Sequence, residues 1–550
     1  MFGAVAAGPE GTVACLGGQH LQSIESACGV AAGYEHTCGV RTDGKTHFWG
    51  TRRSGPEGPT QRALVHLSAG GSDTCGVNQD ARIECWGNRA RPDQDRLCRP
   101  GRSAPRFRRA FLATAVISAG MSDSIAIRPQ TMAPDCAVRI PGSKSYTNRA
   151  LIAAALAEGE TALTGALFSD DTRYMAQALN QLGISVESNA QECSFKVKGA
   201  AGLLPDVQTE VFVGNAGTAA RFLTAVLALG PGRYRIDGVA RMRQRPMDHL
   251  FQALLTLGVE ITHHGSAGCF PATLSGRNRK RGDAQFTLPG NASSQFISGL
   301  LLAAPCVGGA MEIRVEGDLV SKPYLDMTTD VMRHFGVEVE NRGYQSFLVR
   351  AEQRYQAADY EVEPDASAAS YFFAAAALLG GRVTVEGLGT QSRQGDLGLV
   401  DILEKMGARV EREPRRTTVI GNGKLSGVEV DMKNLSDVAQ TLAVVAPFAD
   451  SPTRITGIGF IRQKETDRVG AVVAELNRLG VRADEEDDGY VIYPSQPTPG
   501  LVRTYDDHRM AMSFALIGLK VPGIVIADPG CTSKTFPNYF EVLDTLRREG

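Results

Sequence analysis

The stretch "PGSKSYTNRALIAAALAEG", residues 141–159, begins with polar residues and continues as an almost purely apolar run. A serine at its start and the Ala/Leu run that follows predict a capped helix that is buried on most faces. Lys144 and Arg149 stand in the first turns of this helix, where the helix dipole disfavours positive charge. We therefore expect an anion to be held at this helix start.

The same helix type recurs about every 73 residues from residue 121 onward. The further copies are "NAGTAARFLTAVLALG" (215–230), "NASSQFISGLLLAAP" (291–305), "DASAASYFFAAAALLGG" (365–381), "SDVAQTLAVVAPFA" (436–449) and "DDHRMAMSFALIGL" (506–519). A second, amphipathic helix type alternates with the first and ends in a glycine before a strand, as in "TLGVEI" (256–261). The pattern predicts six α/β units, which divide into two similar domains of three units each with a cleft between them.

The bulk composition excludes several classes of protein. A net charge of -2 gives no basic field for a nucleic acid, and no apolar run is long enough for a membrane span. The first residues are a poor secretory signal, so we expect a cytoplasmic protein. The 11 cysteines include no CxxC pair, so a zinc site is not expected.

The first 120 residues have a different character. The segment "AAGYEHTCGVRTDGKTHFWG" (31–50) recurs as "SAGGSDTCGVNQDARIECWG" (68–87), and each copy reads as a β-hairpin. Residues 1–90 therefore form a β-hairpin repeat fragment, which resembles the regulator-of-chromosome-condensation type of β-propeller. Cys75 and Cys85 flank one turn. The sequence allows either a cross-strand disulfide between them or two free thiols, and it does not decide between these alternatives.

The Arg/Pro-rich residues 91–120 are expected to be a linker rather than a nucleic-acid site. Met121 then opens a stretch that reads like a fresh protein start. This suggests a fusion, or an upstream frame read through into a complete enzyme.

Polar residues gather at or just before the helix starts. Those of the first helix type are Lys144, Ser145, Arg149, Asn215, Thr218, Ser293, Ser294, Gln295, Asp437, His508 and Arg509, with Gly217 between Asn215 and Thr218. Those of the second helix type are Arg245, Ser321, Tyr324, Lys464, Glu465, Arg468 and Lys534. If these helix starts face the cleft, they form a site for several anions. The alternative is that the cations serve only solubility, but then they would be scattered over exposed helix faces.

Two carboxylates are candidates for proton transfer. Asp437 and Glu465 can serve as a base and an acid whose pKa values are set apart by nearby cations. The plainer interpretations are a helix cap for Asp437 and a simple ion pair for Glu465. His508 is either a structural histidine, which we favour slightly, or an aid to the anion site.

Seven motifs in this order make a resemblance specific: "PGSKSYTNRA", "GNAGTA", "SSQF", "GDLVSKPY", "KETDR", "DHRMAM" and "CTSKTFPNYF". From about residue 121 to 550 the chain resembles the 5-enolpyruvylshikimate-3-phosphate synthase family. The resemblance implies transfer of the enolpyruvyl group of phosphoenolpyruvate to the 5-hydroxyl of shikimate 3-phosphate, with release of phosphate. It also implies two inside-out α/β domains and a monomer, with no metal ion, no cofactor and no partner beyond the two substrates.

The resemblance also implies roles for single residues. The shikimate 3-phosphate pocket would comprise Lys144, Ser145, Arg149, Ser293, Ser294, Gln295, Ser321, Tyr324, Asp437 and Lys464. The phosphoenolpyruvate pocket would comprise Lys144, Gly217, Arg245, Gln295, Arg468, Arg509 and Lys534. Asp437 corresponds to the base at the 5-hydroxyl, and Glu465 to the acid that protonates the methylene carbon. Domain 1 would span residues 121–140 and 364–550, and domain 2 residues 141–363.

Two positions depart from the family pattern. Phe460 stands where family members often have an asparagine near the shikimate pocket, so we expect no such asparagine contact with shikimate 3-phosphate in this chain. Phe222 stands where the best-known members have proline, which leads us to expect a different sensitivity to inhibitors that mimic phosphoenolpyruvate.

Two rival interpretations remain. The sister transferase that acts on UDP-N-acetylglucosamine carries a reactive cysteine in the loop "GVARMRQRP" (238–246), which has none here. The other rival is a binding protein that acts through the repeats of the first 90 residues.

Overall fold

The computed structural model describes residues 124–291 and 293–547, together with the backbone of strands β1–β9 before residue 88. The chain divides into two compact units, Met1–Thr114 and Ala115–Gly550, which are considered separately.

In the first unit, three antiparallel sheets are described. They are β1 (Val5–Ala7), β2 (Val13–Cys15) and β3 (Ser23–Ile24); β4 (Ala27–Ala32), β5 (His36–Arg41) and β6 (Thr46–Gly50); and β7 (Leu64–Gly70), β8 (Asp73–Asn78) and β9 (Ile83–Gly87). The side chains of Cys75 and Cys85 and the linker 91–120 lie outside the described residues. The propeller resemblance therefore stays a prediction.

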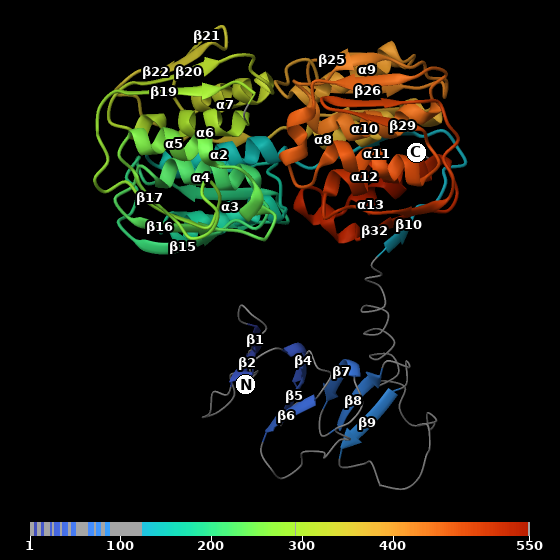
Figure 1. Cartoon of the computed structure of the whole chain (residues 1–550), viewed down its shortest axis with the longest axis horizontal. Helices are drawn as coiled ribbons and strands as arrows, with labels where there is room; N and C mark the ends of the chain where they lie inside the picture. The colour runs from blue at the N-terminus through green and yellow to red at the C-terminus, as the bar shows by residue number, and fades with distance from the viewer. Residues whose placement is uncertain are drawn as a thin grey trace. The chain divides into compact units, whose positions relative to one another are not determined.

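The second unit contains twelve α-helices of two kinds within the described ranges (Figure 1). The buried helices are α2 (Lys144–Leu156), α4 (Gly217–Leu227), α6 (Ser294–Ala303), α8 (Ala366–Leu379), α10 (Ala439–Val445) and α12 (His508–Lys520). The outer helices are α3 (Asp170–Gln181), α5 (Asp248–Thr256), α7 (Lys322–His334), α9 (Leu399–Lys405), α11 (Arg468–Arg478) and α13 (Tyr539–Thr545). The two kinds alternate along the chain, as the sequence predicts.

Six sheets accompany these helices. Three of them, with the strands given in bonding order, are β13 (Ser185–Asn189), β14 (Ser194–Lys198), β12 (Glu160–Thr164) and β23 (Tyr360–Glu361); β15 (Gln208–Phe212), β16 (Arg233–Asp237), β18 (Ala272–Ser275) and β17 (Glu260–His263); and β19 (Ala284–Pro289), β20 (Met311–Glu316), β22 (Ser346–Val349) and β21 (Val339–Arg342).

The other three, again in bonding order, are β11 (Asp135–Val138), β24 (Arg382–Glu386), β26 (Arg416–Ile420) and β25 (Arg409–Glu413); β27 (Glu429–Asp431), β28 (Thr453–Thr456), β30 (Gly489–Ile492) and β29 (Ala483–Glu486); and β10 (Ser124–Ala126), β32 (Ile524–Ala527) and β31 (Gly500–Val502).

One unit illustrates the repeat. Strand β15 leads into α4 and then into the parallel strand β16, so that α4 is the crossover helix. Helix α5 follows, and β17 and β18 then form an antiparallel hairpin that pairs with β16. The glycine that ends α5, Gly258, has a φ of +78°, a left-handed conformation that lets the chain turn into β17.

The six α/β units form two lobes, and each lobe has its own hydrophobic core. The core of lobe 1 is formed by residues between Tyr146 and Val362, including α2, α4 and α6. The core of lobe 2 is formed by residues Ile127–Ile140 and Ala366–Leu546, including α8, α10 and α12. Each lobe thus holds three α/β units around three buried helices, which confirms the predicted fold class.

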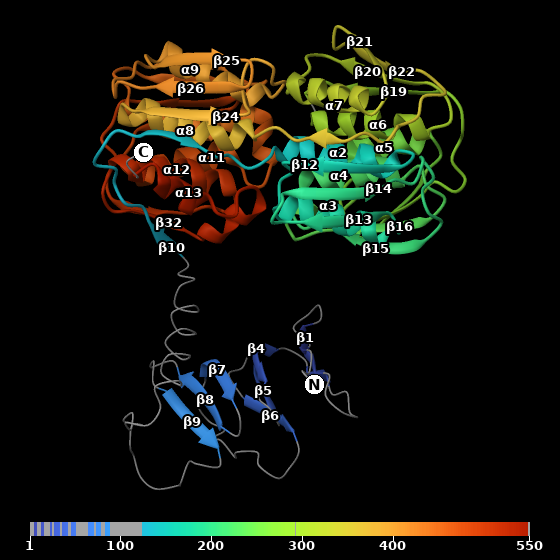
Figure 2. The ribbon, with the colours of Figure 1, turned by 180° about the vertical axis from the view of Figure 1, so that it is seen from behind.

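The chain passes between the lobes twice, as Figure 2 shows from behind. Gly142 pairs with Pro364, and the amide of Ser143 donates to the carbonyl oxygen of Glu363 at 2.8 Å. Asp365 caps α8 through the amide of Ala368 and also accepts from the amide of Lys144, the first residue of α2, at 3.0 Å. One carboxylate therefore binds the starts of two helices in different lobes.

The burial of a helix side chain predicts how strongly its substitution destabilises the fold. Leu301 on α6 is fully buried, whereas Leu255 on α5 is 44% exposed. Leu301→Ala should lower the free energy of unfolding by about 2–5 kcal/mol because it leaves a cavity. Leu255→Ala should change it by no more than about 0.5 kcal/mol. Equal losses in denaturant titrations would contradict this account of the core.

Candidate active site

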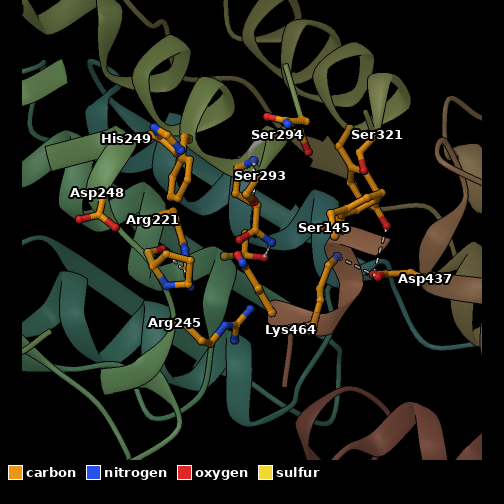
Figure 3. A pocket seen from close by; sticks show the side chains of 18 of the residues that line it. Ser145, Arg221, Arg245, Asp248, His249, Ser293, Ser294, Ser321, Asp437 and Lys464 are labelled. Carbon is orange, nitrogen blue, oxygen red and sulfur yellow. Dashed lines mark hydrogen bonds and ion pairs between the residues drawn. The ribbon is translucent and has the colours of Figure 1, made fainter. Parts of the chain in front are cut away.

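A cavity of about 440 Å³ lies between the two lobes (Figure 3). Lobe 1 contributes the starts of α2 and α6, and lobe 2 contributes Asp437 and Lys464. Eleven of the predicted site residues line it: Lys144, Ser145, Arg149, Arg245, Ser293, Ser294, Gln295, Ser321, Tyr324, Asp437 and Lys464. The helix starts therefore do converge on one cleft.

Capping explains why these helices begin at the cleft. Ser143 precedes α2, and its hydroxyl accepts from the amide of Tyr146 at 3.4 Å. Ser293 precedes α6 and accepts from the amide of Gln295 at 3.3 Å. Each cap satisfies one amide at its helix start, and at α2 the amide of Lys144 is satisfied by Asp365.

The remaining predicted residues, Gly217, Glu465, Arg468, Arg509 and Lys534, are not among the residues that line the cavity. Gly217 and Glu465 lie against Arg245, and Arg468 and Arg509 contact Asp437. Lys534 contacts Glu465 and Asp171, which do not line the cavity. A Cβ atom on Gly217 would lie 2.5 Å from Nη2 of Arg245, so only glycine admits this guanidinium so close to the backbone. Arg245 in turn donates to the carbonyl oxygen of Asn215 at 3.1 Å.

Asp437 is the centre of one charge cluster. It precedes α10 in the 3₁₀ turn Ser436–Val438. Its carboxylate lies 3.0 Å from Nζ of Lys464, 3.2 Å from Nη1 of Arg468 and 2.7 Å from Nη2 of Arg509. Burial alone would raise the pKa of Asp437, but the three cations outweigh it and hold the pKa well below its usual range. The carboxylate is therefore ionised in the free protein.

Glu465 is the centre of a second charge cluster. Its carboxylate lies 2.8 Å from Nη2 of Arg468, 3.7 Å from Nη1 of Arg245 and 3.9 Å from Nζ of Lys534. Burial would raise the pKa of Glu465, but these cations hold it well below its usual range. Arg468 joins the two clusters and is itself fixed by Asp507 at 2.7 Å.

Asp171, at the start of α3, joins the lysines of the two lobes. Its carboxylate lies 3.4 Å from Nζ of Lys144 and 2.6 Å from Nζ of Lys534. The cations at the helix starts are thus paired with carboxylates of the protein itself. This modifies the expectation that they need a bound anion.

Arg149 plays a more structural part than its neighbours. Its guanidinium donates to Thr328 at 2.8 Å, and to the carbonyl oxygens of Ser145 and Tyr324 at 3.0 Å each. It also lies over the ring of Phe222, 5.2 Å from the ring centroid. Burial lowers the pKa of Arg149 to about 10, so the group remains charged at neutral pH.

A further carboxyl group, that of Asp396, lies behind the cavity. The hydroxyl of Tyr324 is 3.2 Å from both Asp396 and Asp437. Burial, and then the charge of Asp437, raise the pKa of Asp396 to about 6. Burial and both carboxylates also raise the pKa of Tyr324, so its hydroxyl keeps its proton.

His508, the first residue of α12, is fully buried, and burial holds its pKa well below the usual range. The ring is therefore neutral, but both of its nitrogens are buried without a hydrogen-bond partner among the described residues, so the prediction of a satisfied structural histidine is wrong in that respect. Across the described part of the chain, no three His, Cys, Asp or Glu side chains are grouped to hold a metal ion.

Sequence reasoning missed Asp171, Arg221 and Asp396. Arg221 lines the cavity and donates to the carbonyl oxygen of Pro246 at 3.2 Å. Asp171 follows a serine in "FSDDTRYM", a start of the second helix type that could have been included on the same grounds as the others. Asp396 has no such signal, because it lies in the 3₁₀ turn Gly395–Gly398.

Solved structures share this architecture. The EPSP synthase of Acinetobacter baumannii is 26% identical, with a TM-score of 0.65 over 76% of this chain and 97% of that chain. The enolpyruvyl transferase NikO of Streptomyces tendae, 20% identical with a TM-score of 0.61 over 77% of this chain and 97% of that chain, shares the fold. The fold is that of the enolpyruvyl transferase class.

Sequence comparison defines the family. The family model for EPSP synthase (3-phosphoshikimate 1-carboxyvinyltransferase) matches residues 132–543. A 3-phosphoshikimate 1-carboxyvinyltransferase of Trichormus variabilis is 50% identical over 418 residues, which cover 76% of this chain and 98% of that protein. One of Vibrio atlanticus is 44% identical over 413 residues, which cover 74% and 96%. This chain belongs to the EPSP synthase family, as the motifs indicate.

Within the described ranges, no helix combines the length and the apolar character that a bilayer crossing demands.

The cationic cleft predicts that inorganic phosphate stabilises the fold. At about a hundred times its Kd, phosphate should add about 2.7 kcal/mol to the free energy of unfolding. Arg245→Gln should reduce this gain in thermal denaturation, compared with chloride at equal ionic strength. Arg277→Gln is the control, because Arg277 forms an exposed pair with Asp206. Equal gains in both variants would contradict phosphate binding at Arg245.

Proposed function

We propose that this chain transfers the enolpyruvyl group of phosphoenolpyruvate to the 5-hydroxyl of shikimate 3-phosphate and releases phosphate, a step toward chorismate and the aromatic amino acids. The observation that carries the proposal is the joint cleft, in which Asp437 and Glu465 lie in linked cationic clusters. The family membership supports the same reaction.

Shikimate 3-phosphate is proposed to bind across the starts of α2, α6 and α7. Ser293, Ser294 and Ser321 offer hydroxyl donors for its phosphate, and Tyr324 and Gln295 stand beside them. Lys144, Ser145 and Arg149 supply donors from α2, and Lys464 from lobe 2. The 5-hydroxyl would then lie within reach of Asp437.

Phosphoenolpyruvate is proposed to bind on the other side of the cavity. Arg245, Lys534, Arg468 and Arg509 supply charge, Lys144 and Gln295 reach the same space, and Gly217 leaves room for close approach. The two substrates are both multiply charged anions and repel each other. The cations of both lobes offset that repulsion more strongly once water is excluded.

The proposed chemistry needs one base and one acid. Asp437 takes the proton of the 5-hydroxyl, and the oxygen attacks C2 of the enolpyruvyl group. Glu465 gives a proton to the methylene carbon, which yields a tetrahedral intermediate. Glu465 then takes a proton back from the methyl group as phosphate leaves, so the double bond is restored. The proton that Asp437 took from the 5-hydroxyl ends on the departing phosphate, so both carboxylates are regenerated.

The two lobes are proposed to be two domains, residues 121–140 plus 364–550 and residues 141–363. Each has its own core, and the crossings near Gly142 and Pro364 are the natural hinge. Closing the lobes would bring Lys464 and Asp437 to the substrate held by lobe 1. The first 120 residues have no proposed part in the chemistry.

Phosphate release tests the function directly. With both substrates the chain should release phosphate, and Asp437→Asn should lower kcat by about 10²- to 10⁴-fold because the base is lost. Asp450→Asn, an exposed carboxylate beyond the end of α10, is the control and should keep the parent rate. Release with UDP-N-acetylglucosamine in place of shikimate 3-phosphate, and none with the latter, would refute the proposal.

The charge around Glu465 predicts a proton-linked binding step. In the free protein Glu465 is ionised, because cations hold its pKa low. Phosphoenolpyruvate bound at Arg245 and Lys534 adds negative charge, which raises that pKa and makes binding take up protons. The uptake should increase as the pH falls from 8 toward 6.

Calorimetry in buffers of different ionisation enthalpy measures this uptake. Glu465→Gln isolates the contribution of this carboxyl group, because the ligand's own protons count equally in both proteins. An uptake that is the same in Glu465→Gln and in the parent would contradict the assignment of Glu465 as the acid.

A further inference from the structure

Arg241 joins the two lobes without lining the cavity. It lies at the start of the 3₁₀ turn Met242–Gln244 in lobe 1 and is partly buried. Its Nε and Nη2 donate to the carbonyl oxygen of Lys464 in lobe 2, at 3.1 and 2.9 Å. Nη2 also donates to the carbonyl oxygen of Arg462 at 3.3 Å. The guanidinium group thus binds two backbone carbonyl oxygens of one short segment, residues 462–464.

The acceptors distinguish this contact from the ion pairs that link the lobes. Lys534–Asp171 and Arg245–Glu465 are ion pairs of the candidate site, so bound substrates compete for their cations. The carbonyl oxygens of Arg462 and Lys464 are backbone groups that no anionic substrate displaces. The contact with Arg241 therefore persists when substrates fill the cavity.

The position of these carbonyl groups matters for the site. The carbonyl of Lys464 belongs to the peptide bond that leads into Glu465, and Arg468 begins α11 three residues later. Arg462 is anchored on its other side by Glu485 at 2.6 Å. The segment 462–465 is thus bound at one end by Glu485 of lobe 2, through the side chain of Arg462, and at the other end by Arg241 of lobe 1, through the carbonyl oxygen of Lys464.

We propose that Arg241 is a positioning residue, a latch between the lobes that fixes the Lys464–Glu465 peptide when the cleft closes. It acts through Lys464 and Glu465 and touches neither substrate. The roles of those two side chains rest on the proposed function, but the latch itself does not. A charge-assisted bidentate contact of this kind is strong enough to bias the closed arrangement.

The test compares two arginines of one loop. Arg243 lies two residues from Arg241, but it pairs with Asp237 inside lobe 1, at 2.8 Å. Arg241→Ala should lower kcat/KM by about ten- to hundredfold, mainly through a rise in KM for both substrates. Arg243→Ala should stay near the parent, and Arg241→Lys should fall between, because lysine keeps the charge without the fork.

Hydrogen exchange of the full chain gives a readout that does not need activity. Without substrates, peptides covering residues 459–467 should exchange faster in Arg241→Ala than in the parent or in Arg243→Ala. Unchanged exchange overturns the latch, and faster exchange with unchanged KM overturns the positioning role. If the parent releases no phosphate, the proposed function fails, while the exchange comparison still decides the latch.

Discussion

The site depends on one electrostatic constraint: many cations from two lobes are held close together, and most of them are buried. Such a cluster is unstable unless carboxylates balance it, because a buried unpaired charge is very costly. Asp171, Asp437 and Glu465 supply that balance, each shared between at least two cations. The arrangement keeps the cations in place and leaves their remaining donors available for anionic ligands.

The fold makes this crowding possible because it orients helices rather than loops toward the cleft. The buried helices are apolar enough to pack as the centre of each lobe, so their polar starts are directed outward at one end. Since each unit repeats this arrangement, six short polar segments become available to one site. The reacting groups then need only short side chains or a single turn to reach the cavity.

Much of this was predictable from the spacing of apolar helices and the residues that begin them. The Ala/Leu runs after Ser143 and Ser293 predict buried helices with capped starts, and both are observed. Pairings across the cleft could not be predicted, because they depend on how two lobes meet. Asp171 and Arg241 act on residues some 220 to 360 positions away. Arg149 was predicted as an anion ligand, yet its guanidinium donates twice to α7, once to Ser145 and once to Ser298 on α6.

The double crossing between the lobes has a consequence for synthesis on the ribosome. Strand β11 pairs in parallel with β24, Asp135 opposite Arg382, so its partner emerges about 250 residues later. At usual elongation rates of about 5–20 residues per second, β24 is synthesised about 12–50 s after β11. Lobe 1 is contiguous between the crossings and can fold during this interval. Vectorial translation therefore imposes an order of assembly in which the inserted lobe is finished before the lobe that encloses its ends.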